Sequence, residues 1–217
     1  MRLILLGPPG CGKGTQAKLL SKRLGLEHIG TGDLLRNAIR QGTSLGLQAK
    51  AAVEAGQLAP DELVNALVAE RFAQPDRPLR FVMDGYPRTL GQAKAFDEVL
   101  RQQRLLIDHV VLLAVPDAEI IARLGGRWSC PSLGCKATYH VVSNPTRVPG
   151  ICDDCGTALV QREDDKVETV QARLVVYHQD TAELIPYYQG QGLLRELNGQ
   201  GQIETIYQSL LKVLQPC

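Results

Sequence analysis

The stretch GPPGCGKGT, from Gly7 to Thr15, decides how this sequence is interpreted. It almost fits the phosphate-loop pattern G-x-x-x-x-G-K-[ST], because Gly7, Gly12 and Lys13 occupy the required positions. Gly14, however, stands where serine or threonine is expected, and the hydroxyl comes one residue later, at Thr15. The sequence therefore predicts either an unusual phosphate loop or a simple glycine-rich turn.

The segments on either side of this loop favour a phosphate site. Residues 1–7, MRLILLG, are predicted to form a short buried strand, and residues 13–25 have helical apolar spacing. Backbone N–H groups, the positive end of the helix and the charge of Lys13 can together neutralise a phosphate. A dinucleotide-type turn is the alternative, but the lysine in a strand–loop–helix context argues against it. Gly14 cannot hold Mg²⁺, which the residue after the lysine does in GTPases.

The composition is that of an ordinary globular chain. Of its 217 residues, 44% are hydrophobic and 22% are charged, which allows one sizeable core with small insertions. The net charge of +1 predicts no general attraction to nucleic acid or to an anionic membrane. No apolar run could span a bilayer, and the start is too short for a signal peptide, so we expect a cytoplasmic protein. There, six cysteines favour metal binding or free thiols over disulfides.

Predicted strands and helices alternate along the chain. Strands are expected at residues 1–7, 26–30, 79–84, 107–116 and 193–197. Helices are expected at residues 13–25, 31–42, 44–56, 60–74, 89–103, 117–127, 164–189 and 203–214. This alternation predicts an α/β fold in three layers, with helices on both faces of a parallel sheet. Residues 128–160, rich in cysteine, proline and glycine, form a clear insertion, and residues 30–59 a weaker one.

A second group of polar residues follows two other predicted strands. TGDLLR offers Thr31 and Arg36, and DGYPRTLGQ offers Asp84, Arg88 and Gln92. Because Arg88 and Gln92 are four apart on a predicted helix, they should share a face that binds a second phosphate and the edge of a base. Asp84 ends a buried strand, where α/β sheets bind ligands, and its carboxylate suits Mg²⁺. Taken singly, Thr31 could cap a helix, the arginines could be surface residues and DGYPR could be a turn.

Together, these motifs resemble those of the adenylate kinases. GPPGCGKGT matches the family's GxPGxGKGT, TGDLLR matches TGDxLR, and DGYPR matches DGxPR, in the expected order. The resemblance covers essentially the whole chain and is to the zinc-containing, long-lid bacterial type. It implies three parts: a phosphate-loop core at residues 1–29, 60–125 and 166–217, a helical AMP-binding segment at 30–59, and a small zinc-bearing lid at 126–165.

The resemblance also assigns residues to the two nucleotides. The expected ATP-binding residues are Gly10, Cys11, Gly12, Lys13, Gly14, Thr15, Arg123, Arg127, Thr138, Tyr139 and Gly201. The expected AMP-binding residues are Thr31, Arg36, Gln57, Leu58, Ala59, Gly85, Tyr86, Pro87, Arg88, Gln92, Arg162 and Arg173. The expected catalytic residues are Lys13, Arg88, Arg127, Arg162 and Arg173, with Asp84 associated with Mg²⁺. Asp164 and Asp165 either orient these arginines or are first-turn acids of a helix.

Four of the six cysteines form two close pairs. Cys130 and Cys135 are separated by four residues and Cys152 and Cys155 by two, with sixteen between the pairs. Two such pairs can converge on one tetrahedral Zn²⁺, a closed structural site, whereas buried free thiols or a redox pair are the alternatives. Zinc-bearing adenylate kinases often have C-x-x-C in the first pair, so CPSLGC predicts a looser first turn. Cys217 is expected to be exposed and unpaired.

The resemblance implies the reaction ATP + AMP ⇌ 2 ADP with Mg²⁺, performed by a monomer that binds neither nucleic acid nor membrane. Positioned cations supply much of the catalysis in phosphoryl transfer, and the phosphate of AMP is already anionic, so no general base is required. A GTP:AMP transferase on the same fold is the nearest alternative. A phosphate-loop hydrolase or switch would leave TGDLLR and DGYPR unexplained, and a zinc-ribbon nucleic-acid binder would not fit the near-neutral charge.

Overall fold

The fold is built on a parallel sheet. The structure, a computed structural model, describes residues 1–132, 134–135 and 137–214, and Cys217 lies outside the described residues. Within these ranges, five parallel strands form the sheet, in the order β2 (Glu27–Gly30), β3 (Phe81–Asp84), β1 (Arg2–Leu6), β4 (His109–Ala114) and β7 (Leu194–Asn198). The predicted α/β class is confirmed.

Alternate residues of the central strand β1 enter two different cores. Leu3 and Leu5 lie in one core, whereas Ile4 and Leu6 lie in the other. β1 pairs with β3 on one edge and with β4 on the other. A strand in this position is covered on both faces, which explains why residues 3–6 are all apolar.

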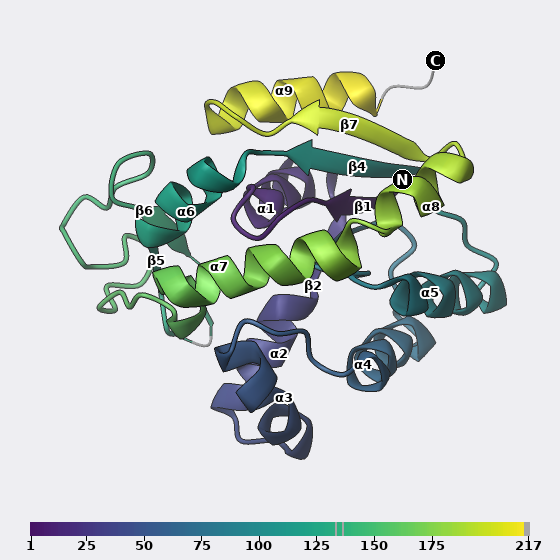
Figure 1. The fold of residues 1–217 in the computed structure, drawn as a ribbon, viewed down its shortest axis with the longest axis horizontal. Coiled ribbons are helices and arrows are strands. Elements are labelled where there is room, and N and C mark those ends of the chain that lie inside the picture. Colours follow the sequence, from purple (N-terminus) through teal and green to yellow (C-terminus); the bar gives the residue numbers. More distant parts are fainter. Residues whose placement is uncertain (133, 136, 215–217) are drawn as a thin grey trace.

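Helices cover both faces of the sheet (Figure 1). One face is packed against α4 (Asp61–Ala73), α5 (Leu90–Gln102) and α8 (Leu184–Gly190). The other face is packed against α1 (Lys13–Leu24), α6 (Asp117–Gly125), α7 (Val167–Val176) and α9 (Ile203–Val213). The three predicted layers are therefore present, with the sheet in the middle.

Two segments extend beyond these layers. After β2, α2 (Thr31–Arg40) and α3 (Ser44–Glu54) pack against each other. After α6, β5 (Arg127–Ser129) and β6 (Thr138–His140) pair antiparallel. Figure 1 shows the β5–β6 segment at one end of the molecule, with α2 and α3 at the lower edge of the view.

The long helix expected at residues 164–189 is divided, and in this respect the prediction is wrong. A 3₁₀ turn, η1 (Glu163–Asp165), comes first, and the extended backbone of Lys166 separates it from α7. A π-helical turn, η2 (Tyr177–Thr181), then separates α7 from α8. Pro186 has no N–H to donate along a continuous helix, which accounts for a new helix beginning just before it.

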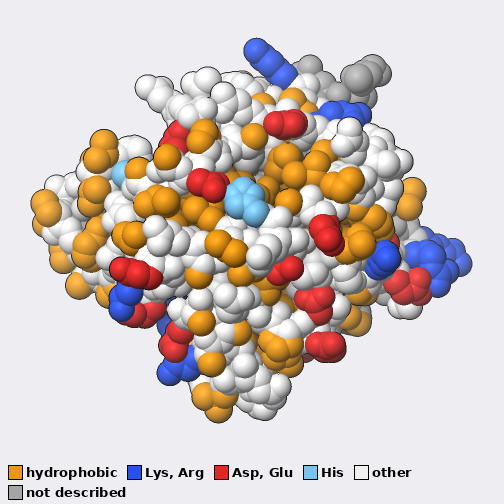
Figure 2. All heavy atoms as spheres, viewed as in Figure 1, with side chains coloured by type: hydrophobic (Ala, Val, Ile, Leu, Met, Phe, Trp, Pro, Cys, Tyr) orange, Lys and Arg blue, Asp and Glu red, His pale blue; other side chains and the backbone are white. Residues whose placement is uncertain are grey.

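The surface is mixed in character. On the face drawn in Figure 2, apolar and acidic side chains are interspersed, and lysine and arginine side chains lie mostly toward the margin. This face therefore presents neither sign of charge alone. Among the described residues, none of the helices combines the length and the apolar character that crossing a bilayer requires.

Three phenylalanines form an aromatic cluster beneath α4 and α5. Phe72, Phe81 and Phe96 are fully buried, and their ring centroids lie 5.2, 5.5 and 6.2 Å apart in edge-to-face pairs. Tyr86 joins the cluster, 5.4 Å from Phe96. Such pairs place the positive edge of one ring against the negative face of another. The cluster holds α4 and α5 against β3, the strand that ends at Asp84.

Replacing Phe72 with alanine should lower the free energy of unfolding by about 3–5 kcal/mol, because removing a buried ring leaves a cavity. Equilibrium unfolding in urea, followed by circular dichroism, measures this change. Leu106→Ala is the control, since that side chain is 75% exposed and its loss should change stability by less than about 0.5 kcal/mol. Similar losses in both variants would contradict the described packing.

Candidate active site

The glycines of the loop between β1 and α1 are required by its backbone. Gly7, Gly10 and Gly12 have φ angles of 135°, 80° and 103°, which side chains on L-residues rarely allow. A Cβ at Gly7 would lie 2.5 Å from the carbonyl oxygen of Leu113, and one at Gly10 would lie 2.7 Å from Cγ of Leu124. The loop therefore turns tightly against β4 and α6, as a phosphate loop must.

Lys13 lies over this loop at the start of α1. Its ammonium group donates to the carbonyl oxygens of Gly7, at 2.7 Å, and Pro8, at 2.8 Å. Among the described residues, no side chain caps α1 at Gly12, and its first turn contains no acid. The helix N-terminus and the lysine therefore present positive charge to one place, which suits a phosphate.

Asp84 explains why glycine follows the lysine. A Cβ at Gly14 would lie 3.1 Å from Oδ2 of Asp84, a distance that leaves little room for a serine or threonine side chain. Burial alone would raise the pKa of Asp84, but a hydrogen bond with His28, 3.4 Å away, and the charge of Lys13 hold it below its ordinary value. The loop departs from the common pattern because a partly buried carboxylate occupies the adjoining space.

A second pocket lies between α2, α4 and α5. It is a small cavity of about 20 Å³ lined by Thr31, Leu35, Leu58, Ala59, Val64, Gly85, Arg88 and Gln92. Most of these are residues expected at the AMP site, and they come from segments as far apart in the chain as Thr31 and Gln92. The structure therefore brings the two motifs TGDLLR and DGYPR together.

Thr31 does not cap α2, so that interpretation of it is wrong. The helix begins at Thr31 itself, with Gly30 in the capping position. The Thr31 hydroxyl instead donates to the carbonyl oxygen of Gly85 at 2.7 Å. Thr31 therefore links the start of α2 to the end of β3, across the pocket.

Arg88 is close to Gln92, but not for the reason that the spacing suggested. α5 begins at Leu90, so Arg88 precedes the helix and does not share a helical face with Gln92. The backbone N–H of Arg88 donates to Oε1 of Gln92 at 2.8 Å, and its guanidinium Nε donates to the Gly85 carbonyl at 2.9 Å. Burial lowers the pKa of Arg88, which nevertheless stays cationic at neutral pH.

The remaining predicted residues of this region differ in exposure. Gln57 is exposed, and its backbone N–H donates to the carbonyl of Ala52 at 2.8 Å. Tyr86 is buried, and its hydroxyl donates to the side-chain oxygen of Asn65 at 2.7 Å. Pro87 follows Tyr86 through a cis peptide bond. Gln57, Tyr86 and Pro87 are not among the residues described as lining the cavity.

Aspartates of η1 hold three of the predicted arginines. Nε of Arg127 donates to Asp165 at 2.7 Å, and Arg173 lies 3.0 Å from Oδ2 of Asp164. Arg36 also reaches Asp164, at 3.7 Å. Burial would raise the pKa of Asp164, but the charges of Arg173 and Arg36 hold it below its usual value. The two acids therefore orient the arginines, and they precede α7 instead of forming its first turn.

The arginines lie around the same two aspartates, so their charges act on one another. Burial is the main reason why the pKa values of Arg162 and Arg173 fall to about 10, and the charge of Arg127 lowers both further. Nε of Arg162 donates to the hydroxyl of Ser129 at 2.8 Å. At neutral pH both guanidinium groups remain charged. Because they lie close to other arginines, an additional anion would be strongly attracted to them.

Arg123 connects the phosphate loop to the loop after β7. Its guanidinium donates to the carbonyl oxygens of Cys11, at 3.4 Å, and Gly199, at 3.0 Å. Glu119, one helical turn earlier on α6, pairs with the same guanidinium. Gly201, in this second loop, has a φ of 108°. Arg123 therefore lies beside the phosphate loop, as expected for an ATP-site residue.

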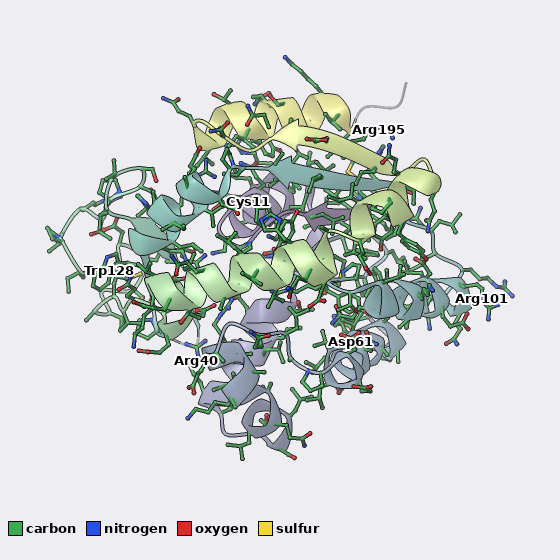
Figure 3. All side chains as sticks on the ribbon, viewed as in Figure 1. Cys11, Arg40, Asp61, Arg101, Trp128 and Arg195 are labelled. Atoms are coloured by element: carbon green, nitrogen blue, oxygen red, sulfur yellow. The ribbon has the colours of Figure 1, made fainter. Side chains whose placement is uncertain are left out.

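Contacts join the β5–β6 segment to the rest of the chain. The ammonium of Lys18, on α1, donates to the hydroxyl of Thr138 at 3.1 Å. Arg40, at the end of α2, donates to the carbonyl of Pro131 at 2.6 Å, and Figure 3 labels it on the side facing this segment. The Tyr139 hydroxyl lies 3.6 Å from the sulfur of Cys152. The tyrosine predicted at the ATP site thus contacts the cysteine cluster.

The four predicted cysteine ligands lie together. The Sγ atoms of Cys130, Cys135, Cys152 and Cys155 are all within 4.8 Å of one another. The closest pairs are Cys130 with Cys155, at 3.4 Å, and Cys135 with Cys152, at 3.6 Å. Tetrahedral Zn–S bonds of about 2.3 Å place sulfur atoms roughly 3.8 Å apart, so this set can hold a metal such as zinc. Cys135 belongs to the group despite the wider first pair.

Sequence reasoning missed two acids of the site, Asp33 and Asp61. Asp33 pairs with Arg36 at 2.7 Å, and their i,i+3 spacing on a predicted helix was a usable signal. Asp61 accepts a hydrogen bond from Gln92 at 2.7 Å. In the sequence, Asp61 looks like an ordinary acid in the first turn of a helix. Its partner Gln92 is 31 positions away, so no local pattern predicts the contact.

A phosphate loop between a parallel strand and a helix, beside a cluster of arginines, defines a phosphate-loop nucleotide-binding protein. The adenylate kinase sequence profile matches residues 5–193. The chain is 50% identical over 214 residues to the adenylate kinases of Citrifermentans bemidjiense and Geobacter sp. strain M21, covering 99% of this chain and 99% of each relative. It is 46% identical over 214 residues to that of Methanothrix thermoacetophila, covering 99% and 98%. The chain belongs to the adenylate kinase family, which confirms the resemblance of the motifs.

Removing a metal from the four cysteines should lower the melting temperature by at least about 4 °C while leaving most turnover at moderate temperature. The reason is that a small segment with little core depends on its metal to stay folded. Calorimetry and a turnover assay, before and after chelation, measure the two effects. Cys152→Ser is the control, since it should melt at the lower temperature with or without chelator. Lost turnover with an unchanged melting temperature would contradict this assignment.

Proposed function

We propose that this chain transfers the terminal phosphoryl group of ATP to AMP and forms two ADP. The observation that best supports this is that two cationic phosphate sites meet at one carboxylate, Asp84. A Cβ at Gly14, the residue after Lys13, would lie 3.1 Å from Oδ2 of Asp84, and a Cβ at Gly85, the residue after Asp84, would lie 3.1 Å from Nη2 of Arg88. A donor phosphate at Lys13 and an acceptor phosphate at Arg88 would therefore adjoin, as in-line transfer requires.

Each nucleotide is assigned to one side of Asp84. ATP would bind at the phosphate loop from Gly10 to Thr15, with Arg123, Arg127, Thr138, Tyr139 and Gly201. AMP would bind in the cavity beneath α2, with its phosphate at Arg36, Arg88, Arg162 and Arg173 and its base near Gln92. Family membership favours ATP over GTP as the donor, and a panel of nucleoside triphosphates tests that choice.

The balance of charge supports phosphoryl transfer. Within the described part of the chain, Lys13 and the arginines at 36, 88, 127, 162 and 173 are grouped with four aspartates, at 33, 84, 164 and 165. The group has more cations than anions, so it is suited to polyanions. The arginines would stabilise the charge that spreads over the moving phosphoryl group, because they are already positioned by their aspartates. Lys13, Arg88, Arg127, Arg162 and Arg173 are the proposed catalytic residues.

Asp84 is the proposed residue for Mg²⁺. It is an ionised carboxylate at the carboxyl end of β3, and Mg²⁺ prefers such oxygen ligands, directly or through water. When bound, Mg²⁺ would neutralise charge on the phosphates of ATP. Gly14 leaves space on the side of Asp84 where other phosphate loops have a hydroxyl.

The cysteine cluster is the proposed site of a structural Zn²⁺. Four thiolates leave no position for water, so the metal would shape the segment at residues 126–165 and take no part in the chemistry. This segment would act as a lid, and its contacts with Lys18 on α1 and Arg40 on α2 support that proposal, because both helices begin at the proposed site. Excluding water matters because ATP at Lys13 would otherwise be hydrolysed.

The other assignments extend the same proposal. Residues 30–59 would form the AMP-binding segment, and residues 1–29, 60–125 and 166–217 the core. The working unit would be a monomer, which light scattering after size-exclusion chromatography tests. We place the protein in the cytoplasm, which fractionation of cells that produce it tests.

Arg88→Ala should reduce kcat/KM for AMP by at least about a hundredfold, because the variant lacks a preorganised cation at the acceptor phosphate. A coupled assay of ADP formation from ATP and AMP measures this. Arg101→Ala is a matched control on the neighbouring helix α5, since Arg101 is 74% exposed and pairs with Glu98 at the surface. The control should retain full activity, and full activity in both variants would place the acceptor phosphate elsewhere.

A further inference from the structure

Both polar atoms of the Gln92 side chain already have partners within the protein. Its Oε1 accepts the backbone N–H of Arg88 at 2.8 Å, and its Nε2 donates to Oδ1 of Asp61 at 2.7 Å. Gln92 is 2% exposed and lines the small cavity proposed for AMP. An amide has two N–H groups and two lone pairs, so one of each remains available.

The partners of Gln92 fix which end of its amide carries the oxygen. An ionised carboxylate can only accept hydrogen bonds, and a backbone N–H can only donate. Turning the amide over would set Nε2 against the Arg88 N–H and Oε1 against the Asp61 carboxylate. Both contacts would then be repulsive, so one orientation is imposed.

Asp61 is itself held in place. Its second oxygen accepts the hydroxyl of Thr89 at 2.6 Å, and that hydroxyl oxygen accepts the backbone N–H of Gln92 at 3.1 Å as the cap of α5. A Cβ at residue 91 would lie 3.1 Å from the same oxygen of Asp61, and glycine there leaves room for it. Figure 3 labels Asp61, at the start of α4 and beside α5.

The main chain of Gln92 is also restrained. The hydroxyl oxygen of the buried Tyr86, whose proton goes to Asn65 at 2.7 Å, lies 3.2 Å from the Gln92 carbonyl oxygen and packs against the main chain there. Together with the cap at Thr89, this contact fixes the backbone from which the side chain extends. The protein therefore fixes both the backbone of Gln92 and the orientation of its side-chain amide.

We propose that Asp61 is a positioning residue that selects adenine over 6-oxopurines by fixing the orientation of the Gln92 amide; this rests on the proposed AMP site. Adenine presents a donor at N6 and an acceptor at N1, whereas hypoxanthine presents an acceptor at O6 and a donor at N1–H. An amide held in one orientation pairs with only one of these orders. The other order sets oxygen against oxygen and N–H against N–H, which leaves polar groups unpaired.

The test compares AMP with inosine monophosphate, whose base is hypoxanthine, as acceptors for the wild type and Asp61→Asn. Asparagine has the same shape but both donates and accepts, so residue 61 no longer dictates the direction of the Gln92 amide. The ratio of kcat/KM for AMP to that for inosine monophosphate should fall about tenfold, since one charge-assisted hydrogen bond is worth about that factor. The Arg88 N–H remains, so some preference should persist.

The control is Glu62→Gln, which removes the neighbouring first-turn acid of α4 from an exposed position. It should leave the ratio unchanged, and Asp61→Ala should lower the ratio at least as much as Asp61→Asn. Equal losses for both acceptors in the Asp61 variants would mean a purely structural role and overturn this inference. A lowered ratio in Glu62→Gln would do the same. A wild type that does not phosphorylate AMP would overturn the proposed function as well.

Discussion

The pairing of partly buried arginines with aspartates is the interaction on which the site depends. Asp164 and Asp165 lie on one short turn, yet they contact Arg36, Arg127 and Arg173, which come from three separate elements. Burying a guanidinium without a partner would cost several kcal/mol, and these acids offset that cost. These two acids are outnumbered by the three arginines that they contact. The cluster keeps an excess of positive charge after this pairing, which suits it to the binding of phosphate.

Recognition of phosphate and recognition of a base make different demands on the protein. Lys13 and Arg88 attract any phosphate, because charge has no direction and tolerates small displacements. Gln92 must offer a donor and an acceptor in a set order, and an amide has no such preference of its own. Asp61 and the cap of α5 provide that preference through hydrogen bonds whose polarity cannot be reversed. In the proposed AMP site, selectivity for the base would therefore be set by residues that lie behind those in contact with the ligand.

The sequence predicted what neighbouring residues determine and missed what distant residues determine. The strand, glycine loop and helix around Lys13 were predictable because they are contiguous, as were the layers of the fold. The cap at Thr31 was wrong because its hydroxyl finds a better acceptor across the pocket, at Gly85. Helical spacing placed Arg88 near Gln92 although Arg88 precedes the helix. A contact such as that of Asp61 with Gln92 produces no periodic pattern in the sequence, so it can be seen only in the folded structure.

The contact between Arg40 and the Pro131 carbonyl relates the two insertions to each other. Pro131 directly follows Cys130, inside the cysteine pair that is two residues wider than the common spacing. The end of α2 therefore contacts the backbone directly beside a predicted metal ligand. A metal bound at Cys130 would restrain the backbone next to that oxygen and would thereby help to fix Arg40. The proposed metal site would in this way help to hold the end of α2 as well as its own segment.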